Sequence, residues 1–386
     1  MQQFTPATAQ ELAEILGSAA AKSQSIQVIG KNSKRSMGGP ILPSETQIST
    51  VNLKRVLKYE RDDLTISVEA GMPLSALQQL LTENGQMIAL DPPFGAETTV
   101  GGLLATNVSG PMRRGYGTAR DLVIGMTFAT LEGKLVKTGG MVVKNVAGLD
   151  MAKVMIGSFG TLAVIASANF RVHPLPPETR TFLFTQRDSE SALDLRDSIV
   201  RGVLQPMALE LITPPAAARL NLKDYVLAVR AGGSRTVLAR YASALSGSDE
   251  LAGTDEMDFW SSVREFPVEF MKRQPNGVVL RISTTLNGLR PLLKMISGAA
   301  IARAASGVAY LCLTNWEQVA QFWNAAAEHG WNAVVEMAGD EARNSHPLWL
   351  ISKDDANVKA FGMMERIKGM FDPNRLLNRS RLYGRI

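Results

Sequence analysis

Five glycine-rich segments in the first 162 residues have the composition expected of a site for a phosphate-containing ligand. The first, at 28–34, reads Val-Ile-Gly-Lys-Asn-Ser-Lys and follows a short apolar run. Consecutive backbone N–H groups in such a turn can form a concave anion site, to which Asn32 and Ser33 add donors and Lys31 adds charge. Taken alone, a loop of this kind is more often an ordinary turn after a strand.

Four more glycine-rich segments follow and lie close together in the chain. They span residues 91–110, 113–125, 139–150 and 156–162. The window from Gly95 to Gly160 holds 13 of the 33 glycines, which indicates backbone that turns tightly or approaches a ligand closely. Apolar runs alternate with these glycines, so the window is predicted to be folded rather than a loop-rich linker.

The familiar nucleotide-binding motifs are absent from the sequence. No Gly-x-Gly-x-x-Gly segment opens a helix after a strand, and no Walker A segment is present. A Gly-x-Ser-x-Gly nucleophile elbow is missing as well. These absences disfavour a Rossmann domain, a P-loop domain and an α/β-hydrolase.

Cysteine and histidine are too scarce for several kinds of site. The single cysteine, Cys312, cannot form an internal disulfide, an iron–sulfur cluster or a cysteine-type zinc site. It lies in an apolar run and is predicted to be a small buried residue. The three histidines, His173, His329 and His346, do not cluster in the sequence, so no metal site is predicted and none of them is a convincing general base.

The overall composition is that of an ordinary globular protein with a mildly basic surface. The 386 residues include 41 Lys plus Arg and 36 Asp plus Glu, which gives a formal net charge of +5. The basic residues are scattered, so no nucleic-acid partner is expected. The N-terminus lacks the pattern of a signal peptide, and no apolar stretch is long enough to span a bilayer. We therefore expect a cytoplasmic protein.

Hydrophobic periodicity predicts a mixed helix and strand chain of the α+β class. Helices are predicted over 8–22, 74–83, 149–156, 189–200, 235–245, 289–302, 316–328 and 358–370. Strands are predicted over 26–29, 64–70, 162–165 continuing toward 172, 181–184, 225–229, 278–282, 308–313 and 333–336. The proline-rich segment 173–177 marks a domain boundary. The expected domains are 1–176, 177–360, and a C-terminal helix and tail at 361–386 that return to the first domain.

The order and spacing of the glycine-rich segments resemble a known family. The segments that carry the resemblance are Thr99-Val-Gly-Gly102, Arg120-Asp121, Val143-Lys-Asn-Val-Ala-Gly148 with Asp150, and Gly157-Ser-Phe-Gly160. They are similar to the FAD-binding domain of the vanillyl-alcohol oxidase (PCMH-type) flavoproteins, and most of all to the FAD-binding E subunits of bacterial glycolate oxidases. The resemblance implies a PCMH-type FAD-binding domain with two α+β subdomains, followed by an α+β cap domain.

The resemblance also implies which residues bind FAD. They are Ile29, Gly30, Lys31, Asn32, Ser33, Pro92, Thr98, Thr99, Val100, Gly101, Gly102, Asn107, Gly110, Lys144, Gly157, Gly160, Thr161 and Ile165. Lys144 could equally form a structural ion pair with Asp150. Some relatives attach FAD covalently through a His or Cys in the first loop, but residues 28–40 contain neither. FAD is therefore expected to be non-covalent.

The substrate side of the site is less complete. The resemblance gives Arg264 and Arg281 as candidate contacts to a substrate carboxylate, and both could instead be ordinary ion-pair residues. The metal-binding His-x-Gly-Asp-Gly-Asn-x-His segment of the catalytic sister subunit is absent. Relatives usually have Tyr at the position of Leu149, so any hydroxyl contact there is lost. Pro-Gly follows the position of Asn378 in relatives but Arg379-Ser380 follows it here, which puts a cofactor role for Asn378 in doubt.

The function implied by the resemblance is that of a subunit in a glycolate dehydrogenase or oxidase complex. The expected partners are a catalytic FAD subunit and an iron–sulfur subunit, and the expected substrate is a small 2-hydroxy acid. Association with the inner membrane would then be peripheral and through the partners. Two alternatives remain: a self-sufficient FAD-dependent enzyme for another 2-hydroxy acid, and a scaffold that has lost its flavin.

Overall fold

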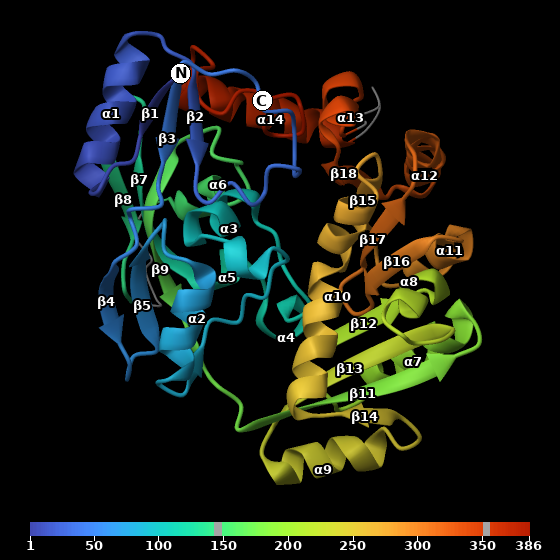
Figure 1. The fold of residues 1–386 in the computed structure, drawn as a ribbon. Helices are drawn as coiled ribbons and strands as arrows, with labels where there is room; N and C mark the ends of the chain where they lie inside the picture. The colour runs from blue at the N-terminus through green and yellow to red at the C-terminus, as the bar shows by residue number, and fades with distance from the viewer. Residues whose placement is uncertain (143–148, 350–355) are drawn as a thin grey trace. The chain divides into compact units, whose positions relative to one another are not determined.

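The computed structural model describes residues 1–142, 149–349 and 356–386, which form two compact units (Figure 1). The first unit contains Met1–Val108, Thr118–Leu175 and Arg343–Ile386, and the second contains Ser109–Gly117 and Pro176–Ala342. The domain boundaries expected from the sequence, which give domains at 1–176, 177–360 and 361–386, remain a prediction. Motif residues 143–148, including Lys144, lie outside the described residues.

The first unit is built on two sheets. A parallel sheet has the order β1 (Gln2–Phe4), β3 (Thr46–Ser49), β2 (Ile26–Ile29). An antiparallel sheet has the order β4 (Val56–Glu60), β5 (Thr65–Glu69), β9 (Val164–Arg171), β7 (Val123–Ala129), β8 (Leu135–Gly139). A short antiparallel pair, β6 (Gln86–Met87) with β10 (His173–Pro174), adds to them.

The first unit also contains helices, most of them short. They are α1 (Ala9–Ala21), α2 (Leu74–Thr82), η1 (Gly95–Glu97), α3 (Val100–Thr106), α5 (Ala119–Leu122), α6 (Ala152–Met155) and α14 (Ala356–Phe371). Helix α1 begins where the Thr8 hydroxyl accepts a hydrogen bond from the Glu11 amide at 3.1 Å, a typical N-cap. Its Leu12 and Leu16 lie one turn apart and are fully buried.

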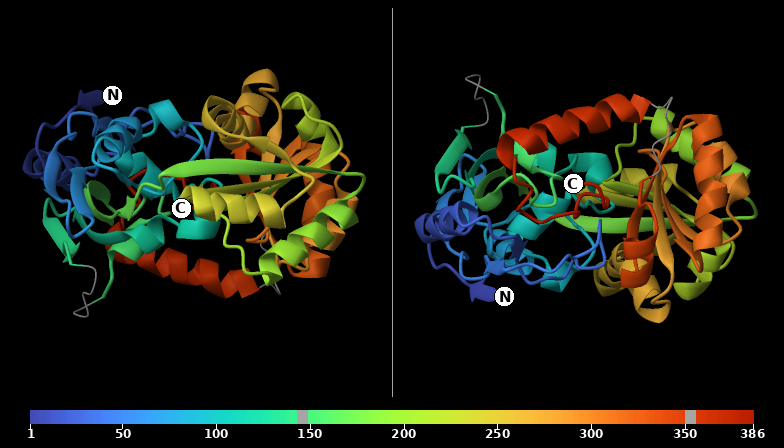
Figure 2. Two further views of the ribbon diagram at one scale, coloured as in Figure 1. Left: turned by 90° about the horizontal axis from the view of Figure 1, so that it is seen from below. Right: turned by 90° about the horizontal axis from the view of Figure 1, so that it is seen from above.

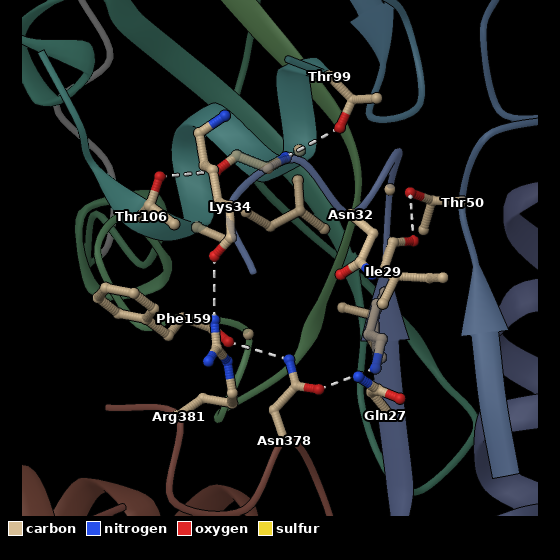
Figure 3. Close-up of a pocket in the computed structure, with 18 of the residues that line it drawn as sticks. Gln27, Ile29, Asn32, Lys34, Thr50, Thr99, Thr106, Phe159, Asn378 and Arg381 are labelled. Atoms are coloured by element: carbon tan, nitrogen blue, oxygen red, sulfur yellow. Dashed lines mark hydrogen bonds between the residues drawn. The ribbon is translucent and has the colours of Figure 1, made fainter. Parts of the chain in front are cut away.

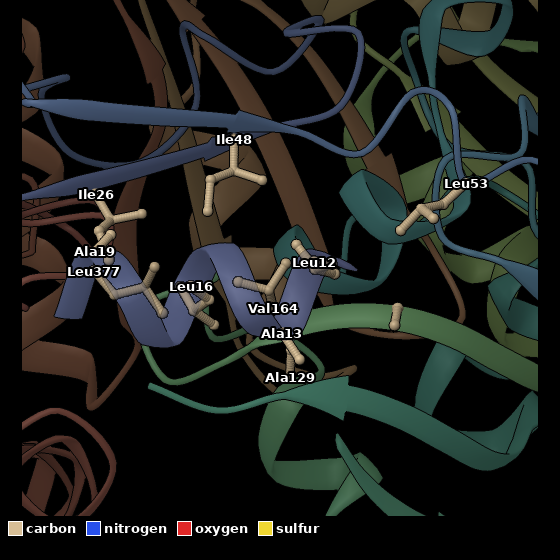
Figure 4. Close-up of a cluster of buried hydrophobic side chains, with 11 residues drawn as sticks. Leu12, Ala13, Leu16, Ala19, Ile26, Ile48, Leu53, Ala129, Val164 and Leu377 are labelled. Carbon is tan, nitrogen blue, oxygen red and sulfur yellow. The ribbon is translucent and has the colours of Figure 1, made fainter. Parts of the chain in front are cut away.

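The core of the first unit joins both sheets through α1. Leu12 and Leu16 of the helix meet Ile26 and Ile48 of the parallel sheet, and Val164 of the antiparallel sheet (Figure 4). Leu377, which lies more than 200 residues after Val164, belongs to the same core. Apolar burial of about 25 cal/mol per Å² makes such contacts the main stabilising term, so the C-terminal tail is an integral part of this unit.

The second unit contains one antiparallel sheet of eight strands. The order is β14 (Asp249–Leu251), β11 (Glu178–Gln186), β13 (Tyr225–Gly233), β12 (Ala208–Ile212), β16 (Ala299–Arg303), β17 (Val308–Leu313), β15 (Val278–Ser283), β18 (Asn332–Ala338). Its helices are α4 (Arg113–Tyr116), α7 (Ser189–Arg201), α8 (Pro214–Arg219), α9 (Arg235–Ala244), α10 (Gly253–Arg273), α11 (Leu289–Met295) and α12 (Trp316–His329). Helix α13 (Asp340–Ser345) spans the division between the units. Figure 2 shows α10 and α7 on opposite faces of the sheet.

One predicted helix of the second unit is wrong. The segment 289–302 forms α11 only as far as Met295, and its second half is strand β16. The run Ala299-Ala-Ile-Ala302 pairs with β12 on one side and β17 on the other, and all four residues are buried. A strand buried on both faces shows a continuous apolar run, which periodicity alone does not separate from a helix.

The other predicted elements are present, with end residues that differ by a few positions. The predicted helix at 149–156 shortens to Ala152–Met155. The elements that the sequence did not predict include β3, β4, β7 and β8 of the first unit, and β12 and the 21-residue helix α10 of the second. Helix α10 carries the predicted substrate residue Arg264. Helix α10 contains Pro267, a residue that normally ends or kinks a helix.

Candidate functional site

A cavity of about 120 Å³ lies in the first unit, where the loop after β2 meets α3 and the turn before β9 (Figure 3). Ten of the predicted cofactor residues line it: Ile29, Gly30, Lys31, Asn32, Ser33, Thr99, Gly101, Gly102, Gly160 and Ile165. This volume is below the range typical of whole-ligand pockets. It suits one part of a dinucleotide, such as a diphosphate.

The loop after β2 and the start of α3 approach each other too closely for larger residues. A Cβ atom on Gly30 would lie 2.4 Å from Oγ1 of Thr99. Thr99 caps α3 by accepting a hydrogen bond from the Gly102 amide at 3.2 Å. One residue earlier in the same helix, the Gly101 amide donates to the Ala70 carbonyl at 2.6 Å. These glycines bring two stretches of main chain together at the wall of the cavity.

Lys34 is a cavity residue that the sequence interpretation did not include. Its side chain is almost buried, with 8% exposed, and its Nζ donates to Oγ1 of Thr98 at 2.7 Å. The same ammonium group lies 5.4 Å from the ring centre of Phe94. Lys31, in contrast, forms an exposed ion pair with Glu97 at 3.6 Å. Lys34 therefore places a desolvated positive charge at the cavity, where it favours an anionic ligand.

The C-terminal tail supplies another wall of the cavity. Asn378 accepts a hydrogen bond from the Val28 amide at 2.8 Å and donates to the Phe159 carbonyl at 2.9 Å, so one side chain joins β2 to the turn before β9. Arg381 donates to the carbonyls of Lys34 and Gly39. Both residues line the cavity. Asn378 therefore lines the cavity even though it is not followed by Pro-Gly.

A buried ion pair holds the tail in position. Lys368 of α14 and Asp372 are 2% and 0% exposed, and their Nζ and Oδ2 atoms are 2.6 Å apart. Burial lowers the pKa of the Lys368 ammonium, and Asp372 opposes this effect. Lys368 also donates to the Thr161 carbonyl at 2.7 Å, while Asp372 accepts from the Leu377 amide at 2.8 Å. The pair thus connects a predicted site residue to the residue before Asn378.

Several predicted cofactor residues do not line this cavity. They are Pro92, Thr98, Val100, Asn107, Gly157 and Thr161 in the first unit, and Gly110 in the second. Asn107 is nevertheless informative. It ends α3 in a left-handed conformation, and its buried Oδ1 accepts no hydrogen bond from any part of the chain that the structure describes. A buried acceptor without a partner is costly, and a ligand N–H group would satisfy it.

The two predicted substrate residues lie in the second unit. Arg281 of β15 donates from Nε to Oε2 of Glu336 at 2.9 Å and from Nη1 to the Ser283 hydroxyl at 3.1 Å. Arg264 of α10 donates to the Ser261 hydroxyl at 3.3 Å, and its Nε lies 3.7 Å from Oε1 of Glu265. Both arginines therefore have an acidic neighbour, and contact with a substrate carboxylate stays a prediction.

Three other titratable residues singled out in the sequence have simple structural surroundings. Burial raises the pKa of the Cys312 thiol to about 12. Burial also lowers the pKa of His173, with Arg171 contributing. Asp150 pairs with Lys153 at 3.6 Å. Among the residues with described positions there is no cluster of three or more His, Cys, Asp or Glu that could hold a metal ion, and no helix there is long and apolar enough to cross a bilayer.

A dinucleotide cofactor fits the glycine-lined cavity, the buried Lys34 and the open acceptor of Asn107. Comparison with known proteins identifies this cofactor. Residues 2–139 match the model of the FAD binding domain family. The chain is an FAD-dependent oxidoreductase with a PCMH-type FAD-binding fold. The predicted fold class and the predicted cofactor, FAD, are thereby confirmed.

The relatives are proteins of the same class. The chain is 29% identical to the glycolate oxidase subunit GlcE of Escherichia coli, over 98% of both chains. It is 26% identical to glycolate oxidase subunit GlcD of Bacillus subtilis and 31% identical to a D-lactate dehydrogenase of Archaeoglobus fulgidus, but it covers only 43% and 46% of those chains. A solved structure of alkyldihydroxyacetonephosphate synthase is similar in fold, with a TM-score of 0.68 at 18% identity, over 97% of this chain and 75% of that one.

Proposed function

We propose that this chain is the FAD-binding subunit of a complex that oxidises glycolate to glyoxylate. The main support is the similarity to glycolate oxidase subunit GlcE over nearly the full length of both chains. The further similarity to subunit GlcD indicates a partner of the same superfamily. Glycolate gives up two electrons and two protons in this reaction, and an iron–sulfur subunit is the proposed electron acceptor.

The proposed binding residues follow from the cavity and its surroundings. The main chain of residues 29–33 and 99–102 would hold the diphosphate of FAD, with Lys34 as the buried counter-charge. Asn107 would accept a hydrogen bond from the ring system, and Asn378 would keep β2 and the Phe159 turn in register. When bound, FAD supplies a two-electron acceptor for alcohol oxidation.

The proposal predicts that the isolated subunit binds FAD but turns over glycolate poorly. The sequence lacks the histidine-rich segment that would activate the hydroxyl, and the described residues hold no cluster of metal ligands. The test is the visible spectrum of the purified protein with FAD, before and after anaerobic glycolate, alone and with the GlcD-type and iron–sulfur subunits. Flavin bleaching only in the presence of the partners supports the proposal. Rapid bleaching of the isolated subunit contradicts it.

A second candidate is a self-sufficient dehydrogenase for another 2-hydroxy acid. It is supported by the similarity to D-lactate dehydrogenases and by the arginines Arg264 and Arg281. In this case a panel of 2-hydroxy acids would include one that bleaches the flavin of the isolated chain, and Arg264→Gln or Arg281→Gln would raise KM for that acid. A colourless protein that takes up no FAD would instead fit a scaffold subunit.

A further inference from the structure

A second cavity lies entirely within the second unit and has no part in the FAD site. It follows one face of α10 and is closed by the turn after α8, with strands β11 and β14 beneath. Its volume is about 390 Å³, which is within the range of small-molecule sites. None of the residues predicted from the sequence to bind cofactor or substrate lines it.

The floor of this cavity is apolar. It is formed by Leu183 of β11, Leu251 of β14, Leu220 and Leu222 of the turn, and Phe259, Phe266 and Phe270 of α10. Phe266 and Phe270 are one helical turn apart, so their rings lie on the same side of α10. Such a floor favours the apolar part of a ligand, because each methylene group removed from water contributes about 0.8 kcal/mol.

Two arginines give one end of the cavity a positive charge. The guanidinium of Arg219 lies 5.4 Å from the ring centre of Phe270 and 6.0 Å from that of Phe266. Neither Arg219 nor Arg273, which also lines the cavity, forms an ion pair with any carboxylate in the described ranges 1–142, 149–349 and 356–386. A guanidinium stacked on aromatic rings keeps its N–H edge available for a carboxylate.

The acidic residues of the cavity do not cancel the positive charge at the arginine end. Glu269 is paired with Lys272, whose Nζ lies 2.7 Å from its Oε1. Asp258 lies on α10 eleven residues before Glu269, or about 16 Å along a helix that rises about 1.5 Å per residue. Charge is therefore sorted along the cavity, with arginines at one end and an acidic side chain at the other.

The geometry points to a binding site for a monocarboxylate with an apolar body. The carboxylate would bind Arg219 and Arg273, and the apolar body would lie on the phenylalanines. A short dicarboxylate would place its second charge over the apolar phenylalanines, and the cost of removing that charge from water would weaken its binding. Glycolate has no apolar body and would gain little here. The inference does not depend on the proposed function, because the site shares no residue with the FAD cavity.

Isothermal titration calorimetry on the FAD-loaded chain tests this site with octanoate, octan-1-ol and octanedioate. We expect saturable one-to-one binding of octanoate, and binding at least about tenfold weaker for the other two ligands. The variants Arg219→Gln and Arg273→Gln should each weaken octanoate binding by about tenfold. The matched control is Arg240→Gln, which removes an exposed arginine of α9 outside the cavity and should leave binding unchanged.

The flavin spectrum is recorded for every variant, so that loss of the FAD site or of folding is seen separately. Arg219 and Arg273 are exposed, and their replacement is expected to leave the fold intact. The inference is overturned if octanoate does not saturate, if octan-1-ol binds as tightly, or if both arginine variants bind octanoate like the wild type. If the chain binds octanoate normally but does not bind FAD, the proposed function is refuted while the inference of this second site holds.

Discussion

Gly30 and Thr99 are held so close together that no side chain fits between them: a Cβ atom on Gly30 would lie 2.4 Å from Oγ1 of Thr99. Gly30 follows β2, and Thr99 caps α3. The contact therefore fixes the distance between the two stretches of main chain that line the cavity. Both residues were predicted from sequence to bind FAD, although nothing local in the sequence shows that they touch.

Replacing Gly30 should weaken FAD binding more than it weakens the fold. In Gly30→Val the branched side chain must push the loop away from Thr99, so we expect FAD affinity to fall by at least about tenfold, or about 1.4 kcal/mol. Flavin fluorescence quenching on titration measures this. The control is Gly362→Ala in α14, where an added Cβ meets no atom within 4 Å. Equal affinity of Gly30→Val and wild type would contradict the assignment of this loop.

Lys34 should contribute to FAD affinity through its charge. Lys34→Met keeps the length and apolar character of the side chain but removes the ammonium group beside the cavity. We expect about a tenfold loss of FAD affinity and a weaker dependence of affinity on salt. The control is Lys22→Met at the exposed end of α1. Unchanged affinity with reduced thermal stability would show that Lys34 only supports Thr98.

The buried pair of Lys368 and Asp372 should be essential for stability. Lys368→Met leaves the Asp372 carboxylate buried without its counter-charge, and removal of one partner of such a pair costs about 3–5 kcal/mol. Urea unfolding, with the free energy extrapolated to water, measures the loss. Lys359→Met, an exposed lysine on the same helix, should change stability by less than about 0.5 kcal/mol. Similar curves for both variants would refute a structural role of the pair.

FAD should leave the protein when the protein unfolds. The first loop has neither His nor Cys, and the one cysteine, Cys312, is buried in the second unit. Acid precipitation of the yellow protein should therefore leave essentially all flavin in the supernatant. Flavin that stays with the pellet, and a matching mass increase of the denatured chain, would show a covalent bond.

Cys312 should be inert in the native protein. With a pKa of about 12, roughly one thiol in 10,000 is ionised at pH 8, and only the thiolate reacts with iodoacetamide. Mass spectrometry should detect no labelling after an hour at pH 8, and complete labelling in urea. Rapid native labelling would show that the strand β17 opens easily.

Much of the fold could be predicted because its signals are local. The Thr8 cap with Leu12 and Leu16 indicates α1, and the alternation at 64–70 indicates β5. The helix prediction for segment 289–302 was wrong because the strand half, β16, is buried on both faces of the sheet, so its apolar run has no period of two. Whether such a segment forms a helix or a strand depends on its strand-pairing partners, and these lie far away in the chain.

The sequence alone determined the class of ligand, because a glycine needed for close main-chain approach must be written into the chain itself. Gly30, Gly101 and Gly160 belong to the glycine-rich segments; the family resemblance implies that they bind FAD, and all three line the cavity. Only the tertiary structure could place Asn378, whose role was in doubt from the sequence, at the cavity, and only it could add Arg381; both come from the other end of the chain. Their side chains become part of the site only when folding places them beside Val28 and Lys34, because contacts between residues so distant in sequence leave no local sequence pattern.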